Sequence, residues 1–245
     1  MRIAVVADIH GNLPALEAVV ADVARRGVDA VVNLGDCVSG PLLPLETAQF
    51  LMAQDWRHIA GNHERQLLTG GPGRWNESDA FTHPRLGANE LAWLASMKPT
   101  LCLQDDVFLC HGTPTSDVDY FLEVVEPTRV RTATLAEVDA RLGDVRASLV
   151  LCGHTHVPKA VRSSQGQLIV NPGSVGLPAF EDGRPYPHVM ETGSPDARYA
   201  LVERLGDVWA ASLIAVPYDH LSMAKLAGTN GRADWARALA TGLAT

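Results

Sequence analysis

The sequence predicts an α/β fold with a buried parallel sheet. The chain has 245 residues, of which 47% are hydrophobic, and this length suits one large domain. Short β-branched runs alternate with segments whose apolar residues recur every three or four positions. An order of strand, helix and strand is typical of parallel sheets covered by helices. We expect a single domain over residues 1–245, with a helical tail from about residue 218.

The first strand-helix-strand unit is the most regular. Arg2–Ala7 predicts a buried strand, which ends at a turn rich in Gly and Asn. Apolar residues then recur at helical spacing from Leu13 to Val23, with Pro14 in the first turn and Gly27 as a C-terminal cap. The run Asp29–Leu34 predicts the second strand, parallel to the first.

The same alternation continues along the chain. Further helices are expected near 45–54 and 88–96, buried strands at 57–60, 107–110, 148–152 and 167–170, two antiparallel strands at 197–204 and 208–216, and a helix near 232–243. Two stretches, Thr69–Arg85 and Pro178–Pro195, are rich in Gly, Pro or polar residues and are expected to be irregular. Such loops are either functional or tolerated surface insertions.

The charge balance argues against several classes of partner. Lys plus Arg is 20 and Asp plus Glu is 28, so the net charge is −8, which disfavours strong nucleic-acid binding or a nuclease. The sequence contains no signal-peptide core and no run of about 18 apolar residues. We therefore expect a cytoplasmic protein without membrane contact.

Five segments place Asp, Asn or His directly after a predicted strand and beside Gly. They are Asp8-Ile9-His10, Gly35-Asp36, Gly61-Asn62-His63, His111-Gly112 and Gly153-His154-Thr155-His156. Any one of them alone is more typical of a turn. In an α/β sheet, however, the carboxyl ends of the strands line one crevice, so all five should converge there.

The converging side chains form a ligand set for divalent metals. Imidazole, carboxylate and amide oxygen together suit Mn²⁺, Fe²⁺ or Zn²⁺ without a thiolate. A carboxylate shared between two ions holds them roughly 3.5–4 Å apart, as two-metal hydrolases require. Asp36 is the candidate for this shared carboxylate.

In this order the five motifs resemble those of the calcineurin-like metallophosphoesterase superfamily. Asp8-Ile9-His10-Gly11-Asn12, Gly40-Pro41 and Asn171-Pro172-Gly173-Ser174 resemble its small bacterial and archaeal phosphodiesterase branch. The resemblance extends from Asp8 to Ser174. It implies the metallo-dependent phosphatase fold, a four-layer α-β-β-α sandwich of two mixed β-sheets.

The resemblance also implies a role for each motif residue. One ion would be held by Asp8, His10, Asp36 and His156, and a second by Asp36, Asn62, His111 and His154. The ions would be Mn, Fe, Zn or Ni, with Mn favoured for activity. A hydroxide bridging the ions would attack phosphorus in line, and His63 would protonate the leaving group. The alternative for His63 is a structural neighbour of Asn62.

One departure from the family pattern concerns phosphate binding. Protein serine/threonine phosphatases of the superfamily carry an Asp-Arg pair three and four residues after the Gly-Asp aspartate, and here these positions are Ser39 and Gly40. Substrate binding would then rest on the metals and on Asn12, without the arginine clamp. The missing pair argues against a phosphoprotein phosphatase and leaves the orientation of His63 unexplained.

We expect a phosphodiesterase acting on a small phosphodiester or a nucleotide-like substrate. The alternative activity is a phosphomonoesterase, including a dinucleoside polyphosphate hydrolase. A noncatalytic metal-binding scaffold is the alternative of another class, although scaffolds typically lose metal ligands and this chain keeps all of them. The antiparallel strands and the helical tail could form a homo-oligomer interface or cap one sheet.

Overall fold

The computed structural model describes residues 1–104 and 106–245, and its main strands form two five-stranded mixed sheets. The strand order is β14-β13-β1-β2-β3 in the first sheet and β4-β5-β8-β10-β9 in the second. The first contains β1 (Arg2–Val6), β2 (Ala30–Asn33), β3 (Arg57–His58), β13 (Ala197–Leu205) and β14 (Val208–Val216). The second contains β4 (Thr100–Leu103), β5 (Val107–Cys110), β8 (Leu149–Leu151), β9 (Lys159–Arg162) and β10 (Leu168–Asn171).

Both sheets combine parallel and antiparallel pairs, which confirms the two mixed sheets implied by the resemblance and the parallel pairing expected within the first unit. Strands β1, β2 and β3 are parallel, but β13 pairs antiparallel with β1 and also with β14. The second sheet likewise has parallel β5, β8 and β10 with an antiparallel strand at each edge. The two antiparallel strands expected near the C-terminus are β13 and β14. They belong to the first sheet, where β13 pairs with the edge of β1 that β2 leaves free.

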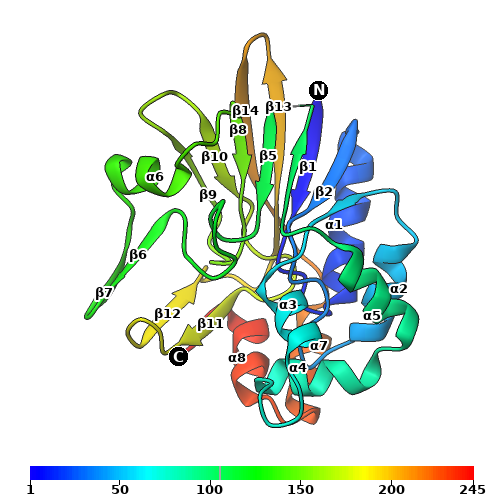
Figure 1. Cartoon of the computed structure of the whole chain (residues 1–245). Helices are drawn as coiled ribbons and strands as arrows, with labels where there is room; N and C mark the ends of the chain where they lie inside the picture. Colours follow the sequence, from blue (N-terminus) through cyan, green and yellow to red (C-terminus); the bar gives the residue numbers. More distant parts are fainter. Residues whose placement is uncertain (105) are drawn as a thin grey trace.

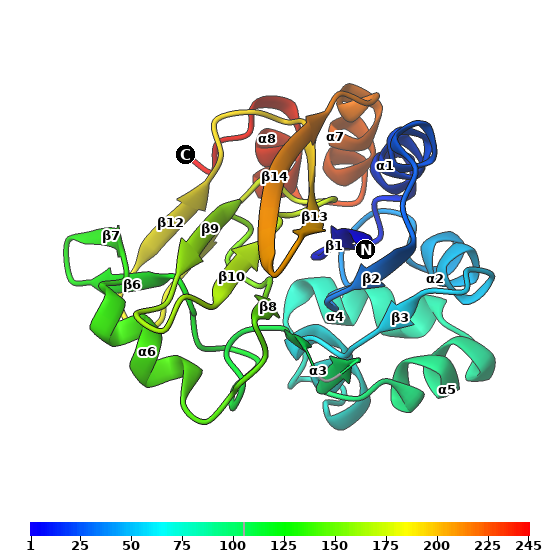
Figure 2. The ribbon, with the colours of Figure 1, turned by 90° about the horizontal axis from the view of Figure 1, so that it is seen from above.

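The two sheets pack face to face, with helices on the outer faces (Figure 2). Side chains alternate along β1: Ile3 and Val5 pack against the second sheet, whereas Ala4 and Val6 pack against helices. Helices α1 (Leu13–Arg26), α2 (Pro44–Met52) and α5 (Ala88–Ser96) cover the first sheet, and α6 (Leu135–Leu142) covers the second. The four-layer α-β-β-α arrangement is thereby confirmed.

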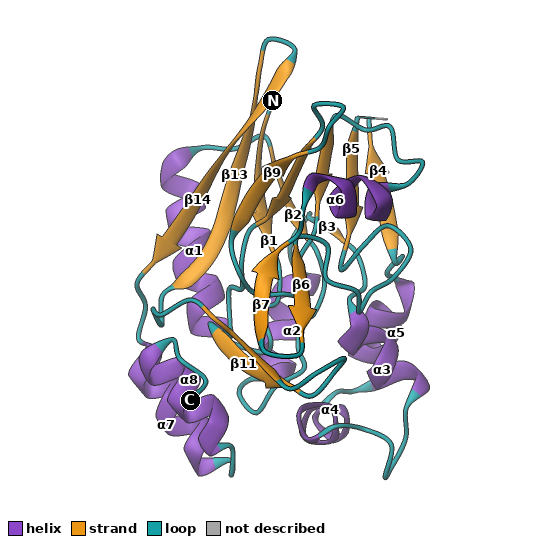
Figure 3. Cartoon of the chain, turned by 90° about the vertical axis from the view of Figure 1, so that its left-hand side faces the viewer, coloured by secondary structure: helices purple, strands orange, loops and turns teal. Residues whose placement is uncertain are grey.

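The strands β1 and β5 run toward the lower end of the molecule in Figure 1, where several short elements gather. These are α3 (Asn62–Thr69), α4 (Glu77–Thr82), α7 (His220–Thr229), α8 (Ala233–Thr241), and the hairpins β6 (Glu123–Glu126) with β7 (Arg129–Thr132) and β11 (Ala179–Asp182) with β12 (His188–Glu191). Figure 3 shows α4, α7, α8 and β11 at this same end. Of these elements, α3, α4, α8, β6 and β11 contribute residues to the cleft at the strand ends.

The two stretches expected to be irregular contain regular structure. Residues 69–85 include α4 and a 3₁₀ turn (His83–Arg85), because Asn76 caps α4 by accepting a hydrogen bond from Asp79 N. Residues 178–195 include the β11–β12 hairpin. Its Pro185 and Pro187 lie in the connection between the strands, where no ladder hydrogen bond is lost.

The helical tail is a pair of packed helices, α7 and α8. Trp235 and Leu239 of α8 are buried against Leu177 and Ala179, next to β11. The tail therefore forms a small core of its own beside the strand ends. Among the described residues, no helix has the length and apolar character required to cross a membrane.

Candidate metal centre

The strand ends bring the predicted site residues together. Asp8 and His10 follow β1, Asp36 follows β2, His111 follows β5, and both His154 and His156 follow β8, while Asn62 and His63 begin α3. A cleft reaches this cluster and is lined by His10, Asp36, Asn62, His63, His154 and His156, whereas Asp8 and His111 lie deeper. The segments thus converge as the α/β order predicts.

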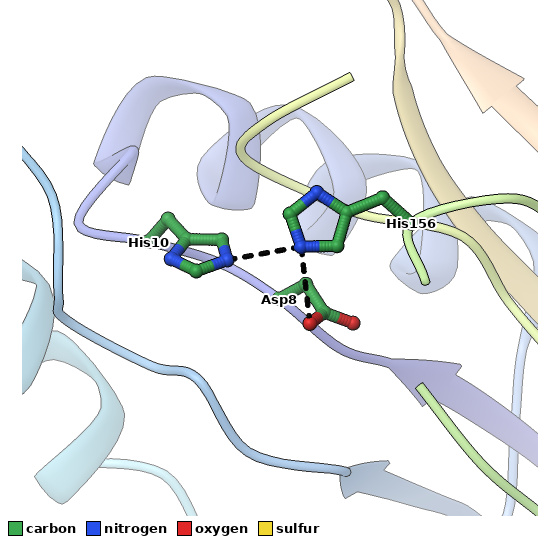
Figure 4. A group of neighbouring side chains, drawn as sticks. All are labelled: Asp8, His10 and His156. Carbon is green, nitrogen blue, oxygen red and sulfur yellow. Dashed lines mark hydrogen bonds and ion pairs between the residues drawn. The ribbon is translucent and has the colours of Figure 1, made fainter. Parts of the chain in front are cut away.

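The first group consists of Asp8, His10 and His156 (Figure 4). The Nε2 atom of His156 lies 3.3 Å from Asp8 Oδ1 and 3.1 Å from His10 Nε2. All three side chains are buried, and their ligand atoms lie within 4.8 Å of one another. One cation can therefore contact all three.

Backbone carbonyls fix the tautomers of both histidines. Nδ1 of His10 donates to Ser39 O at 2.8 Å, and Nδ1 of His156 donates to Leu177 O at 2.7 Å. When these rings are in the neutral form, Nε2 is the unprotonated atom that each presents to the cluster. Burial and the nearby His156 lower the pKa of His10 to about 3, so this ring stays neutral.

The atoms facing one another in this group need a cation between them. Two Nε2 lone pairs 3.1 Å apart repel, and Asp8 Oδ1 is a buried acceptor without a hydrogen-bond partner in the described part of the chain. A divalent ion would satisfy all three atoms at once. The residues present therefore fit a metal.

The second group contains Asp36, His111 and His154, with Asn62 beside it. His111 donates from Nδ1 to Leu34 O at 2.7 Å, and its Nε2 lies 3.2 Å from Asp36 Oδ2 and 3.1 Å from Asn62 Oδ1. His154 uses Nε2 to bond Val118 O at 3.1 Å, which leaves Nδ1 as its ligand atom. The four residues expected to hold the second ion therefore lie close together.

Electrostatics differ between the two histidines of this group. Burial favours a neutral His111, but the Asp36 charge and hydrogen bond outweigh it and raise the pKa to about 10. Burial, followed by the charge of His111, lowers the pKa of His154 to about 4. A metal held here would replace the proton shared by Asp36 and His111.

Asp36 lies between the two groups. Its Oδ2 is 3.2 Å from His111 Nε2 and 4.0 Å from His10 Nε2, and its Oδ1 accepts a hydrogen bond from His63 N at 3.0 Å. One oxygen is thus held by the backbone while the other faces both groups. This is the position that a shared carboxylate requires.

Most of the described non-glycine residues with a left-handed backbone lie at this cluster. Positive φ angles between 53° and 70° occur at Asp8, His10, Asp36, His154 and His156, five of the six such non-glycine residues in the described chain. A non-glycine residue in this conformation is strained and persists only where its surroundings impose it. The strand ends therefore hold five of the site side chains in fixed, costly orientations.

The motif glycines allow the backbone to approach the carboxylates. A Cβ at Gly61 would lie 2.3 Å from Asp36 Oδ1, and one at Gly153 would lie 2.8 Å from Asp8 Oδ2. Because glycine has no Cβ, nearby backbone N–H groups reach these carboxylates. His154 N donates to Asp8 Oδ2 at 3.1 Å, and His63 N donates to Asp36 Oδ1 at 3.0 Å. The other oxygen of each carboxylate stays free for the cluster.

Glu64 has a larger role than the sequence indicated. Its buried carboxylate accepts hydrogen bonds from the N–H groups of Asp36, Cys37 and Gly61, each at 2.8 Å. It therefore joins the loop that carries Asp36 to the start of α3. The signal was its place three residues after Gly61, the spacing of a capping box.

His63 lies at the edge of the cluster, within 4.8 Å of ligand atoms of His10 and Asp36. Its Nδ1 is 2.8 Å from Oδ1 of Asp79, a buried residue of α4 that sequence reasoning missed. Burial lowers the pKa of His63, but the charge of Asp36 and the hydrogen bond to Asp79 raise it to about 9. No local motif marked Asp79, because it lies in a stretch expected to be a loop.

Asn12 serves the scaffold rather than the cleft. Its Oδ1 accepts from Ala15 N as the N-cap of α1, and its Nδ2 donates at 2.9 Å to both Gly176 O and Tyr218 OH. The residue is fully buried. Its polar atoms are engaged within the protein, and Asn12 is not among the residues that line the cleft.

Aromatic rings surround the cluster. Phe180 of β11 lies 4.7 Å from the ring of His156, Trp235 of α8 lies 5.8 Å from His10, and Tyr120 lies 5.3 Å from His154, measured between ring centroids. All three rings line the cleft. They give it apolar walls above a polar floor.

Known proteins share this architecture. The structure is similar to a metallophosphoesterase from Sphaerobacter thermophilus, with a TM-score of 0.77, 24% identity and 99% of both chains covered. A hypothetical protein from Pyrococcus horikoshii OT3 gives a TM-score of 0.75 at 19% identity over 98% of both chains. At these identities the similarities establish the fold.

Sequence comparison establishes the family. An uncharacterized protein of Methanocaldococcus jannaschii is 28% identical over 201 residues, which cover 72% of this chain and 76% of that protein. Residues 1–193 match the family described as the calcineurin-like phosphoesterase superfamily domain. The chain therefore belongs to the calcineurin-like phosphoesterase superfamily and is a metal-dependent hydrolase of phosphoric esters.

Proposed function

We propose that the protein is a phosphodiesterase with two divalent metal ions. Mn²⁺ is the ion proposed for activity, and the substrate is a small phosphodiester or a nucleotide-like molecule. Asp8, His10 and His156 would hold one ion, Asn62, His111 and His154 the other, and Asp36 would be shared.

The observation that carries this proposal is the fixed direction of the histidine lone pairs. Nδ1 of His10, His111 and His156 each donates to a backbone carbonyl, so three Nε2 atoms face the carboxylates. Outer hydrogen bonds of this kind orient metal-ligating histidines and increase their basicity. Asp8 Oδ1, unpartnered among the described residues, adds an anionic ligand at the same place.

The chemistry divides between the metals and the chain. When bound, two divalent ions supply Lewis-acid activation of water and neutralise charge on the phosphate. Asp36 would be the ligand common to both ions and Asp8 a ligand of one, while Tyr120, Phe180 and Trp235 line the cleft beside them. His63 is placed to donate the proton that the leaving oxygen needs, which is work suited to imidazole.

The surroundings of residue 40 favour diesters over monoesters. A Cβ at Gly40 would lie 2.6 Å from the Trp235 ring and 2.5 Å from His10 O, so no arginine fits there. The nearby Arg232 is engaged by Asp234, Glu77 and Ser78. With no arginine at residue 40 and Arg232 already paired, the site suits the single negative charge of a diester better than the double charge of a monoester.

The test is turnover of bis-p-nitrophenyl phosphate and p-nitrophenyl phosphate by metal-stripped protein with Mn²⁺ added back. We expect Mn²⁺ to restore hydrolysis, with the diester preferred. A strong monoester preference would support a phosphomonoesterase instead. Stoichiometric metal binding without cleavage of either ester would support a noncatalytic scaffold.

A further inference from the structure

We propose that Asp79 is a positioning residue that holds His63 in the orientation needed to protonate the leaving group. The inference rests on the proposed function, because it assigns a task within that reaction. It is carried by a side-chain cluster outside the metal ligands. The cluster consists of His63, Asp79 and Ser39.

The contact between Asp79 and His63 is buried and short. Asp79 is 1% exposed, and its Oδ1 lies 2.8 Å from His63 Nδ1. The hydroxyl of Ser39 donates to the same Oδ1. The other oxygen, Oδ2, has no hydrogen-bond partner within the described residues, so the imidazole and the hydroxyl are what hold this carboxylate.

The backbone position of Asp79 is fixed independently of His63. Asn76 caps α4 through Asp79 N at 2.8 Å, and Gly40 N donates to Thr82 Oγ1 at 3.0 Å. Arg232 ties the same helix to the tail through Ser78 Oγ at 2.9 Å. Since α4 is anchored at several points, Asp79 can restrain His63 rather than follow it.

Asp79 supplies the carboxylate that this chain lacks three residues after Asp36. Ser39 stands where the related protein phosphatases carry that aspartate, and here its hydroxyl contacts an aspartate supplied by α4. The carboxylate therefore reaches His63 from α4, 16 residues after His63 and 40 residues after Ser39. The stretch 69–85 is accordingly part of the active site rather than a tolerated insertion.

The proton path is simple. His63 keeps its Nδ1 proton in the bond to Asp79, so Nε2 is the atom that transfers a proton. As the oxygen of a water molecule bonds to phosphorus and the P–O bond to the leaving group breaks, the Nε2 proton goes to the leaving oxygen and the ring becomes neutral. A proton from water restores it.

The experiment compares two diesters that differ in leaving group. Bis-p-nitrophenyl phosphate releases a stable phenolate and needs little protonation, whereas diphenyl phosphate releases phenolate, a poorer leaving group. For Asp79→Asn we expect kcat for diphenyl phosphate to fall roughly 100-fold, the lower range of general acid catalysis, with a much smaller loss for the nitrophenyl ester. KM and bound Mn²⁺ should not change.

His63→Ala is the reference variant. It should show the same leaving-group pattern, and the double variant His63→Ala with Asp79→Asn should be no slower than His63→Ala alone. Equal losses on both diesters, or additive losses in the double variant, would overturn the proposal. If wild-type protein with Mn²⁺ cleaves neither diester, the proposed function has failed instead.

Two further measurements cover the case in which Asp79→Asn does not fold. Ser39→Ala removes the second partner of Asp79 and should lower kcat for diphenyl phosphate alone, by a smaller factor. The His63 Nδ1 proton should also give a downfield NMR signal in wild-type protein that His63→Ala lacks. A leaving-group pattern unchanged by Ser39→Ala, together with no such signal, would contradict the proposal.

Discussion

The strand ends and the surrounding wall build the two sides of the site in different ways. At the strand ends, each histidine of the group His10, His111 and His156 is held by a backbone carbonyl. In the wall, formed by α4, β11 and α8, side chains contact side chains: Asp79 meets His63, Phe180 meets His156, and Trp235 meets His10. The difference suggests that metal binding depends on local motifs, whereas substrate handling depends on contacts between distant segments.

The largest effect should follow from breaking the strand-end side at Asp36. For Asp36→Asn we expect at least a roughly 100-fold loss of diester hydrolysis and weaker uptake of both ions, because the shared carboxylate is gone. Turnover and bound Mn²⁺ per chain would be measured together. Asp29→Asn, which changes an exposed carboxylate paired with the N-terminus, is the matched control. Full metal content in Asp36→Asn would contradict the shared role.

Glu64→Gln tests whether metal binding also depends on the hydrogen bonds that Glu64 accepts from the loop carrying Asp36. We expect a loss of about 10–100-fold in Mn²⁺ affinity, because an amide cannot accept all three N–H bonds that orient the Asp36 loop. Metal titration of stripped protein gives the affinity. Glu90→Gln alters the corresponding cap of α5, bonded to Gly87 N, and should lower stability without changing metal affinity. Equal metal affinities in the two variants would count against the proposal.

Phe180→Ala tests the wall. The ring lies on His156 and lines the cleft, so we expect KM for a diester to rise about 5–10-fold, the range of one aromatic contact, while bound Mn²⁺ stays constant. Phe180→Tyr keeps the ring and is the control. Loss of metal in Phe180→Ala would show that wall and strand ends are not separable.

The smallest effect on catalysis is expected at Asn12. Asn12→Ala removes the N-cap of α1 and should lower the free energy of unfolding by about 1–2 kcal/mol, with kcat/KM nearly unchanged. Denaturant unfolding and diester kinetics measure the two effects. A large rise in KM at unchanged stability would instead place Asn12 in contact with substrate.

The same contrast explains what the sequence could predict. The strand-helix alternation and the Gly-Asp and Gly-Asn-His segments indicated the convergence of Asp8, Asp36 and Asn62, because strand ends meet at one sheet edge. The left-handed backbone at Asp8 and Asp36 could not be predicted from the sequence, because Asp is common in turns in general.

The wall could not be predicted in the same way. Asp79 contacts His63 across 16 residues and Ser39 across 40 residues, and the short α4 is obscured by the neighbouring Gly and Pro of its stretch. The β11–β12 hairpin was obscured for the same reason, because its prolines lie in the turn rather than in the strands. Contacts of this range depend on how the layers pack, which no local spacing reveals.

The central claim is that the strand ends hold two metals, and it can be tested by crystallography of protein soaked with Mn²⁺. Anomalous scattering should give two peaks roughly 3.5–4 Å apart, the separation typical of two-metal hydrolases. One should lie against Asp8, His10 and His156, the other against Asn62, His111 and His154, with Asp36 touching both. A single peak, or peaks away from these residues, would contradict the account.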